Sequence, residues 1–599
     1  MLKNESMQTE YPRPQFERKS WMCLNGIWDF EFDDNNMGEK EHWFDQTSLQ
    51  NKIKVPFVYE SRASGIGITE QHENVWYHRT FRIPKLQAGK HVLLNFQGVD
   101  YRAKVWINGR PAGQHVGANT AFDMDITDYV KLDGDNQITV KAEDGESCYQ
   151  PRGKQRWMDH NFLCWYTQST GIWKTVWLEF VSQTRLQKVK ITSDIDHACV
   201  KFEYLFHRIN PSEKLILKTQ ITCNGNHIQE FTFAVSRETM EYTVNIIDDA
   251  ITQKIFLWTP DKPDLYQVKF TLTKSGCVID EVISYFGMRK ISTGNGKIYL
   301  NNQEIYQKLV LEQGFWPETL LTPPSDEAIC KEIDCIRDMG FNGVRIHQKV
   351  EDERFLYFCD QRGLLVWSEM SAAYAFSDEA VMDFVKEWMQ IVEQQYNHPS
   401  IIVWTPFNES WGIPNVRCDP RQQSFTETIY YLTKSLDPMR PVITNDGWEH
   451  TISDIITIHD YGGNARSFFE KYRDENCALQ KDASSGSGRR LFADGFHYSG
   501  QPVIFSEFGG IALKEMEEDA QSWGYGEKAV DAKEFIQRYA EMLSAIKDIK
   551  YVAGYCYTQL TDVQQEQNGL YTENRVAKIA PDEIKKINSD HSHMKGFIF

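Results

Sequence analysis

After residue 288 the sequence alternates between short apolar runs and amphipathic helical segments, a pattern that favours parallel strands joined by helical crossovers. Eight apolar runs can be counted in this stretch, and eight parallel strands close a (β/α)8 barrel. The expected strands are Glu304–Leu309, Gly343–Ile346, Leu364–Trp367, Ile401–Pro406, Val442–Asn445, Ile455–Ile458, Val503–Ser506 and Val552–Tyr557. We therefore predict that residues 288–599 form a TIM barrel.

One helix of this stretch illustrates the pattern. Ser325 is placed to cap a helix whose first turn is acidic, and Gly340 is placed to end it. Between them a single apolar stripe runs along the helix, formed by Ile329, Ile333, Ile336 and Met339. The next strand begins only three residues after Gly340, as barrel units require.

The first half of the chain reads as short alternating strands separated by turn residues. We predict a β-sandwich of the jelly-roll type over residues 1–181, in which Asn108-Gly109 forms a tight hairpin because both residues tolerate positive φ. Residues 182–287 again alternate with period two and contain no long helix, which is typical of an immunoglobulin-like sandwich. The predicted fold is therefore multidomain, with two β-sandwiches followed by the barrel.

The charge of the chain argues against some partners. Asp and Glu number 84 against 65 Lys and Arg, and the net charge of -19 repels polyphosphate and anionic lipid. The amino terminus has no apolar signal-peptide core, and no stretch approaches the ~18 apolar residues of a membrane span. We expect a cytoplasmic homo-oligomer that binds neither nucleic acid nor membrane.

Two carboxylates stand at the ends of predicted barrel strands, where barrel enzymes place their catalytic groups. Glu409 follows Asn408 after the fourth strand, and Glu507 ends the seventh. A facing pair of carboxyl groups is what retaining glycoside cleavage needs, one to protonate the leaving oxygen and one to attack the anomeric carbon.

These two motifs, Asn408-Glu409 and Ser506-Glu507-Phe508-Gly509, resemble the acid/base and nucleophile signatures of glycoside hydrolase family 2. Further segments are similar to the family in the same order along nearly the whole chain: Val105–Gly109, Gly171–Trp173, Phe286–Arg289 and Asn397–Ser400. The resemblance implies that Glu409 is the general acid/base, that Glu507 is the nucleophile, and that Asn408 contacts the sugar 2-hydroxyl. It implies an exo-acting enzyme for terminal β-linked sugars of a small carbohydrate or glycoconjugate.

Family analogues of four further residues line the sugar subsite, and the same role is expected of His347, Glu369, Tyr461 and Tyr557. Tyr461 is expected to hydrogen-bond the nucleophile, and Tyr557 to stack on the sugar ring. His347 has an alternative interpretation as a core residue whose nitrogens are already bonded.

Two departures from the family limit the choice of sugar. Trp165 stands where family galactosidases and glucuronidases usually present an Asp, and the usual glucuronidase Asn-x-Lys clamp is missing after the eighth strand. The acidic and histidine metal ligands of the large galactosidases are also missing after Glu369. We expect neither a metal nor another cofactor.

A basic cluster in the first domain, Arg152, Lys154 and Arg156, has two interpretations. It is either an exposed basic loop, which we prefer, or a loop that reaches the barrel mouth and binds a uronate carboxylate. We therefore expect a β-galactosidase on family frequency, with a β-uronidase (galacturonidase or glucuronidase) as the alternative. A carbohydrate-binding protein without catalysis is a remote third possibility, since such a protein need not keep both carboxylates.

The long connection over residues 463–500 contains the only low-complexity stretch, Asp482–Arg489. A loop of this size at the carboxyl face of a barrel is either an active-site lid or a disordered surface insert. Both interpretations stay open.

Overall fold

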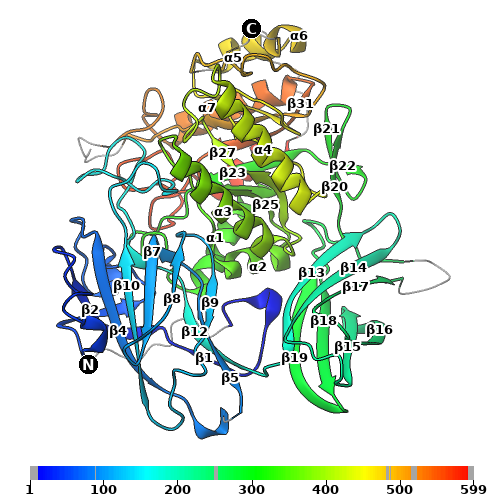
Figure 1. Ribbon diagram of the computed structural model, residues 1–599. Coiled ribbons are helices and arrows are strands. Elements are labelled where there is room, and N and C mark those ends of the chain that lie inside the picture. Colours follow the sequence, from blue (N-terminus) through cyan, green and yellow to red (C-terminus); the bar gives the residue numbers. More distant parts are fainter. Residues whose placement is uncertain are drawn as a thin grey trace.

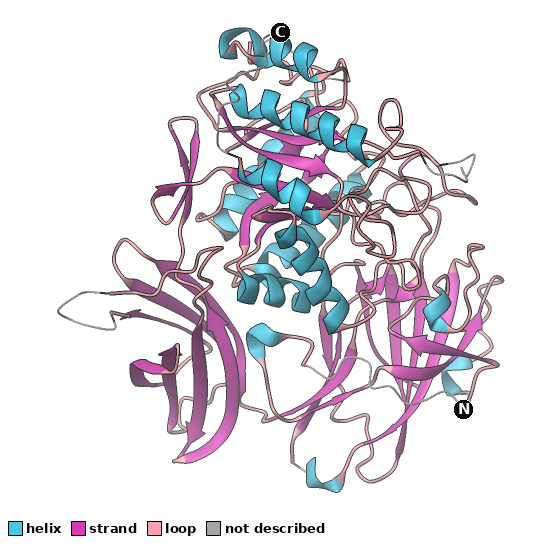
Figure 2. Ribbon diagram, turned by 180° about the vertical axis from the view of Figure 1, so that it is seen from behind, coloured by secondary structure: helices cyan, strands magenta, loops and turns pink. Residues whose placement is uncertain are grey.

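The computed structural model describes residues 11–87, 89–247, 254–480, 484–485, 487–514 and 522–590. Two β-sandwiches lie side by side beneath a barrel, so that each sandwich contacts the barrel from below (Figure 1). Seen from behind, nearly all helices belong to the barrel and nearly all long antiparallel strands belong to the sandwiches (Figure 2). The predicted fold class is confirmed.

The first sandwich packs a six-stranded sheet on a four-stranded sheet, with a short strand pair at one end. Its hairpin at Asn108-Gly109 is confirmed, since both residues have positive φ (51° and 75°) and Ile107 pairs with Arg110. In sheet order the strands are β3 (Asn51–Val55), β2 (Gly26–Phe32), β4 (Asn74–Arg82), β10 (Asp135–Glu143), β7 (Arg102–Ile107) and β8 (Arg110–Val116), then β1 (Trp21–Cys23), β12 (Val176–Val181), β5 (His91–Phe96) and β9 (Phe122–Asp125), then β11 (Gly171–Ile172) and β6 (Val99–Asp100).

The second sandwich packs a three-stranded sheet on a four-stranded sheet, and alternate residues of each strand face one apolar core. A small antiparallel sheet then leads into the barrel. These strands are β13 (Arg185–Asp194), β14 (Cys199–His207) and β17 (Thr239–Asn245), then β16 (Asn226–Ala234), β15 (Leu215–Cys223), β18 (Tyr266–Lys274) and β19 (Cys277–Phe286), then β20 (Ile291–Gly294), β21 (Lys297–Leu300) and β22 (Gln303–Glu304).

The barrel contains a curved parallel sheet of seven strands, and a short parallel pair continues it. The seven strands are β26 (Ile401–Thr405), β25 (Leu365–Glu369), β24 (Gly343–Ile346), β23 (Gln307–Glu312), β31 (Val552–Thr558), β30 (Val503–Gly509) and β29 (Ile456–Asp460), and the pair is β27 (Phe407–Asn408) and β28 (Asn445–Asp446). Apolar side chains such as Leu309 and Trp367 fill the interior, as in a closed barrel.

Two predicted barrel strands differ from those observed. The first strand is β23, three residues later than expected, because residues 303–304 belong to the small sheet before the barrel. The fifth strand pairs regularly only over β28, two residues long. Pro406 has no N–H to donate, so it interrupts the fourth strand between β26 and β27. Single contacts such as the Ile443 amide bonded to the Trp404 carbonyl (2.9 Å) bridge the interruption.

The barrel helices cover the outside of the sheet. The predicted capping of the first helix is confirmed, because the Ser325 side chain accepts from the Ala328 amide, and Gly340 has φ +79°. The helices are α1 (Asp326–Asp338), α2 (Glu353–Arg362), α3 (Asp378–Gln395), α4 (Pro420–Leu436), α5 (Ala465–Tyr472), α6 (Glu475–Ala478), α7 (Ala532–Asp548) and α8 (Pro581–Ser589). Within the described residues, no helix combines the length and the apolar character needed to cross a membrane.

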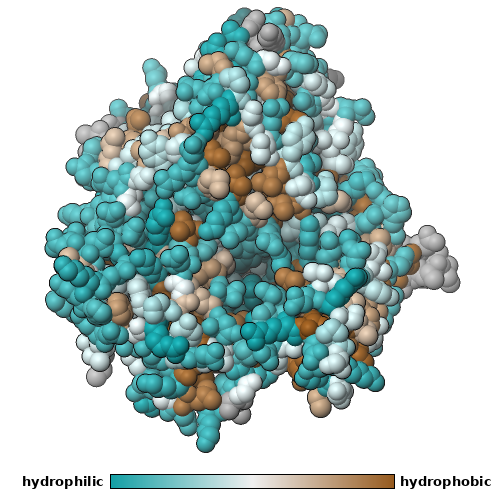
Figure 3. Space-filling view, viewed as in Figure 1, coloured by the Kyte–Doolittle hydropathy of each residue, from teal (hydrophilic) through white to brown (hydrophobic). Residues whose placement is uncertain are grey.

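The three domains meet in the middle of the molecule. A cleft of about 370 Å³ there is lined by residues of both sandwiches and of the barrel, among them Asn95, Lys188 and Glu353, and the surface is hollowed near its centre (Figure 3). Arg18 fastens the two sandwiches to each other, since its guanidinium lies 2.9 Å from Glu179 and 3.0 Å from Asp280.

Candidate active site

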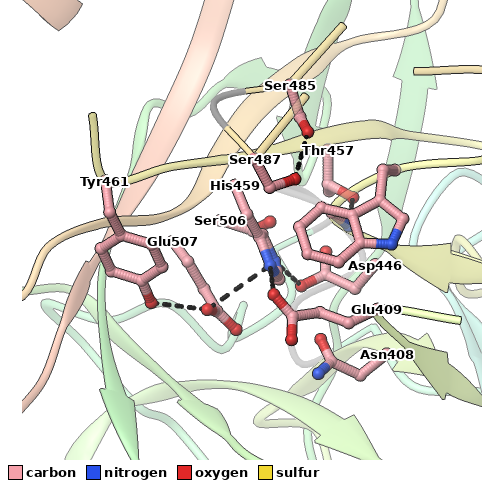
Figure 4. Close-up of polar contacts among 12 residues, drawn as sticks. Asn408, Glu409, Asp446, Thr457, His459, Tyr461, Ser485, Ser487, Ser506 and Glu507 are labelled. Atoms are coloured by element: carbon pink, nitrogen blue, oxygen red, sulfur yellow. Dashed lines mark hydrogen bonds and ion pairs between the residues drawn. The ribbon is translucent and has the colours of Figure 1, made fainter. Parts of the chain in front are cut away.

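Glu409 and Glu507 face each other at the carboxyl ends of their strands (Figure 4). Glu507 lies within β30, and Glu409 directly follows β27. One oxygen of each carboxyl group lies within 4.8 Å of the other. Such a close approach is what a retaining glycosidase requires, since its two carboxyl groups lie roughly 5 Å apart.

The backbone at Glu409 is unusual. Glu409 and Ser410 both have positive φ (52° and 60°), a backbone conformation that residues other than Gly, Asn and Asp seldom adopt. The Glu409 amide donates to the Asp446 carbonyl (2.9 Å), and the Ser410 amide donates to the Asn445 side chain (3.0 Å). These contacts with the fifth strand hold the turn and aim the Glu409 side chain at the barrel axis.

Arg345 of β24 is the centre of the polar network under the two carboxylates. Its guanidinium, fully buried, donates to Glu507 (2.7 Å), Glu369 (2.8 Å) and the Asn408 side-chain oxygen (2.7 Å), and lies 2.8 Å from Asp446. The surrounding carboxylates raise the pKa of Arg345 further although burial opposes the charge. This fixed cation keeps the nucleophile candidate in place.

His459 of β29 lies between the acidic side chains. Its Nε2 is 2.8 Å from Asp446, and its Nδ1 is 2.9 Å from Glu409 and 3.4 Å from Glu507 (Figure 4). Burial alone would lower the pKa of His459, but the charges of Glu507 and Asp446 raise it to about 10. At neutral pH the ring is therefore an imidazolium that donates from both nitrogens.

Glu409, His459 and Glu507 each bring a ligand-type atom within 4.8 Å of the others, so this is where a cation would fit by geometry alone. Both nitrogens of the His459 ring are already engaged by protein carboxylates, Nε2 by Asp446 and Nδ1 by Glu409. The same ring already neutralises the neighbouring carboxylates.

The protonation of three site residues follows from their surroundings. Burial favours a raised pKa for Glu409, but His459, Lys154 and Arg345 outweigh it and lower that pKa. Burial raises the pKa of Glu369 to about 7 against the opposing charge of Arg345. His347 has a strongly lowered pKa because it is buried beside Lys154 and Arg345.

The structure brings Asn408, His347, Glu369 and Tyr461 together around the two carboxylates. Tyr461 donates to Glu507 (2.6 Å), as expected from the sequence. His347 Nδ1 lies 3.0 Å from the Arg345 guanidinium and 3.2 Å from Glu369. The buried Asn408 amide nitrogen has no hydrogen-bond partner among the described residues.

Tyr557 lies elsewhere, which corrects the expectation of a stacking platform. Its ring is fully buried and packs edge-on against Phe508 and against Tyr539 of α7. Residue 557 of β31 therefore faces the helical layer and not the barrel interior, because side chains alternate along a strand.

The preferred interpretation of the basic loop as an exposed surface is wrong. Arg152 is only 2% exposed, and it donates to the carbonyl oxygens of Ser147 (2.9 Å) and Arg156 (3.0 Å). The Arg156 guanidinium bonds Gln168 (2.7 Å) and Asn161 (3.0 Å) in the same way. Both arginines hold the loop together.

The loop does reach the barrel mouth. The amides of Arg152 and Gly153 donate to the Ala372 carbonyl (3.0 and 3.1 Å), just after the third strand. Trp165, which stands where family members have an Asp, packs edge-on against Trp411 at a centroid distance of 5.4 Å. Trp165 thus covers the side of the mouth next to Glu409 instead of offering a carboxylate.

Lys154 differs from the two arginines of this loop, because among the described residues no backbone carbonyl or side-chain amide bonds its ammonium. It is 7% exposed, and its ammonium bonds Cys164 Sγ (3.3 Å). No carboxylate lies within 4.0 Å of it among the described residues, although Glu566 and Glu409 are near enough to act on it. Burial opposes its charge, yet Cys164 and Tyr374, followed by Glu566 and Glu409, raise the pKa of Lys154.

The connection over 463–500 contains α5 and α6, and part of its low-complexity stretch lies outside the described residues. Arg489 lies 3.1 Å from Glu449, and Glu449 accepts from the Ser410 hydroxyl (2.6 Å) beside Glu409. The described end of the connection therefore packs against the site; opening and closing of this segment stays a prediction.

The sequence interpretation missed Arg345, Asp446 and His459. Arg345 lies inside an apolar strand, where a charged residue pointing into a barrel already indicates a site. Asp446 and His459 follow the fifth and sixth apolar runs, so a search that extended one or two residues beyond every strand end would have found them.

Three family models match the chain in order: "Glycosyl hydrolases family 2, sugar binding domain" over residues 21–178, "Glycosyl hydrolases family 2" over 184–289, and "Glycosyl hydrolases family 2, TIM barrel domain" over 293–590. Among solved structures, a β-glucuronidase from Ruminococcus gnavus is similar with a TM-score of 0.77 and 18% identity, covering 96% of this chain and 98% of that one. A family 2 β-galacturonidase from Eisenbergiella tayi has a TM-score of 0.73 and 20% identity over 99% of this chain and all of its own.

Curated relatives carry both kinds of name. A putative β-glucuronidase of Formosa agariphila is 27% identical over 66% of this chain, and a β-galactosidase of Thermoanaerobacter pseudethanolicus is 26% identical over 73%. The matches span only 48% and 56% of those two proteins. Together with the three matched domains and their order, these likenesses lead to one conclusion: the chain belongs to glycosyl hydrolases family 2.

Proposed function

We propose that this protein is a retaining exo-β-glycosidase whose substrates are β-uronides, and that β-galacturonides and β-glucuronides are the sugars to test. The separation of Glu409 and Glu507 supports the retaining mechanism. The relatives and neighbours named above include a putative β-glucuronidase, a β-glucuronidase and a β-galacturonidase, which supports the uronide.

The reaction proceeds in two displacements. Glu507 attacks the anomeric carbon while the protonated carboxyl group of Glu409 gives its proton to the leaving oxygen, which forms a glycosyl ester on Glu507. Glu409 then takes a proton from water, and the resulting attack on the anomeric carbon frees Glu507. Arg345 and Tyr461 hold Glu507, and the free amide of Asn408 meets the sugar 2-hydroxyl.

The observation that carries the uronide is Lys154. A buried ammonium without a close counter-ion is costly, and a carboxylate on the sugar would supply that partner. Lys154 is also close enough to Glu409 and His347 to act on their protonation. A neutral hexose would leave the ammonium as it is and gain little from it.

The experiment compares kcat/KM for nitrophenyl β-galacturonide, β-glucuronide and β-galactoside in wild type and in Lys154→Met. We expect the uronides to be preferred, and the substitution to cost about 2 to 4 kcal/mol in transition-state stabilisation for them alone. Arg156→Met is the matched control, since its buried guanidinium bonds only its own domain among the described contacts. That control should affect all three substrates alike.

A β-galactosidase remains the second candidate, because relatives such as that of Thermoanaerobacter pseudethanolicus carry that name. It predicts a galactoside preference that Lys154→Met leaves unchanged, and that result would overturn the uronide proposal. An α-configured first product, seen by proton NMR before mutarotation, would overturn the retaining mechanism.

A further inference from the structure

Burial favours a raised pKa for Glu409, but His459, Lys154 and Arg345 lower it, whereas the proposed first step needs a proton on this residue. Nδ1 of His459, a nitrogen that can carry a proton, lies 2.9 Å from the Glu409 carboxyl group. The residues around this contact fix the position of the His459 ring.

Several features place the His459 ring with little freedom. The pairing of β29 with β30 shifts register between Ile458 and His459, so Ser506 is the extra residue and His459 comes level with Glu507. Such bulges redirect side chains next to active sites. Gly447 then makes room for the ring, because a Cβ at this residue would lie 2.7 Å from Nδ1.

The second ring nitrogen is fixed as well. Nε2 lies 2.8 Å from Asp446, whose carboxylate also lies 2.8 Å from the Arg345 guanidinium. The pKa of Asp446 is strongly lowered by Arg345 and His459 against the effect of burial. Asp446 therefore stays ionised and holds the imidazolium while Nδ1 faces the two carboxylates.

We propose that Glu409 and His459 act as one acid, in which a single proton is shared between the carboxyl group of Glu409 and Nδ1 of His459. His459 is a positioning residue in this scheme, since it touches Glu409 and not the sugar. The inference rests on the proposed function and adds how its acid is supplied with a proton.

The proton balance is as follows. Before cleavage the proton moves from Nδ1 to the Glu409 carboxyl group and then to the leaving oxygen as its bond to the anomeric carbon breaks and the bond to Glu507 forms. His459 is then neutral and Glu409 ionised, ready to act as the base. The proton that Glu409 takes from water in the second step returns to Nδ1, which restores the starting state.

Between the two macroscopic pKa values of such a pair, the fraction with the proton on Glu409 does not change with pH. The basic limb of kcat/KM should thus follow the upper value, set by His459, and not that of an isolated carboxyl group. The charged or titratable groups facing His459 are Glu409, Asp446, Glu507, Arg345, His347 and His450.

The test is His459→Asn, whose amide can still donate a hydrogen bond to Glu409 but carries no transferable proton. With the best glycone, methyl and dinitrophenyl β-glycosides are compared from about pH 5 to about pH 8. We expect the methyl glycoside to lose about 100-fold in kcat/KM at the upper pH and under tenfold at the lower, and the dinitrophenyl glycoside to lose less than about fivefold at both. An unmoved basic limb, or an equal loss at both pH values, overturns the proposal.

His450→Asn is the matched control, because His450 is equally buried but its Nε2 bonds the backbone of Thr457 (2.8 Å). This control substitution should leave the basic limb of the kcat/KM profile at the same pH as in wild type. A substrate-free measurement separates this proposal from the proposed function: nitrogen NMR of labelled histidine in the full-length enzyme should show both His459 nitrogens protonated beyond pH ~8, whereas titration near ~6.5 overturns the proposal even if no glycoside is cleaved.

Discussion

At the scale of single residues, the site contains two kinds of polar side chain: those whose hydrogen bonds the protein completes and those whose bonds it leaves incomplete. Arg345 donates to Glu507, Glu369 and Asn408 and lies beside Asp446, and His459 bonds Asp446 and Glu409. Among the described residues, the Asn408 amide nitrogen has no hydrogen-bond partner and the Lys154 ammonium bonds only Cys164 Sγ. In the proposed function, residues already bonded by the protein prepare the carboxylates, and the incompletely bonded ones select the sugar.

The first prediction concerns the nucleophile. Glu507→Gln should lower kcat about 10³-fold or more, since the amide cannot attack the anomeric carbon, while the protein still folds with Tyr461 and Arg345 able to bond it. Steady-state rates and thermal unfolding measure the two effects. Retention of more than about a hundredth of wild-type activity is incompatible with this role.

The second prediction concerns the acid/base. Glu409→Ala should slow substrates with poor leaving groups far more than activated aryl glycosides, because a good leaving group needs little protonation. Azide should restore turnover and yield a β-glycosyl azide, detectable by mass spectrometry and NMR. Equal losses for all leaving groups, without an azide product, would contradict the assignment.

At the scale of elements, the barrel strands were predictable from their apolar runs, and the capped helix from Ser325 and Gly340. The extent of the fifth strand was not predictable, because its pairing partner, the fourth strand, is interrupted at Pro406, which has no N–H to donate. Nor could the sequence show which way Tyr557 points, since one bulge or one shifted strand start inverts the alternation.

An element-scale prediction follows from His398, which fastens α2 to the start of β26. Its ring bonds Asp360 (2.6 Å) and Glu353 (3.1 Å); burial alone would lower the pKa of His398, but these carboxylates raise it to about 9. His398→Gln should cost about 3 to 5 kcal/mol because a buried charge loses its partner.

The pH dependence of that cost has a definite sign. The folded pKa lies above the unfolded value of ~6.5, so the stabilisation is complete below pH ~6.5 and disappears as the pH rises through about 9. Denaturant unfolding of wild type and His398→Gln across this range should show that their difference in the free energy of unfolding becomes smaller as the pH rises. Exposed His197→Gln serves as the control, and a constant difference would refute the charged state of His398.

At the scale of the whole molecule, the barrel mouth is completed by the first sandwich. The basic cluster in the sequence indicated that this loop could reach the barrel mouth. Its burial could not be predicted, because the loop docks through hydrogen bonds to the Ala372 carbonyl, about two hundred residues away in the chain. Long-range docking of this kind leaves no local pattern to read.

The fourth prediction tests this docking. Gly153 has φ +58°, and a Cβ there would lie 2.1 Å from the Gln348 carbonyl oxygen, so Gly153→Ala should push the loop off the barrel. We expect kcat/KM for the preferred sugar to fall by about 1 to 3 kcal/mol of transition-state stabilisation, with a smaller effect on an aryl glycoside lacking the carboxylate. Gly225→Ala, also at positive φ but in open space, is the control and should leave activity unchanged.

The entry of a sandwich loop into the barrel mouth also bears on how such enzymes diversify. If Lys154 selects the sugar as proposed, bond cleavage and sugar choice are encoded in separate stretches of the gene, since the carboxylates come from barrel strands and Lys154 from the first sandwich. Recombination that exchanges only the segment encoding the first sandwich can then change the sugar that an otherwise unchanged catalytic barrel accepts, in a single event.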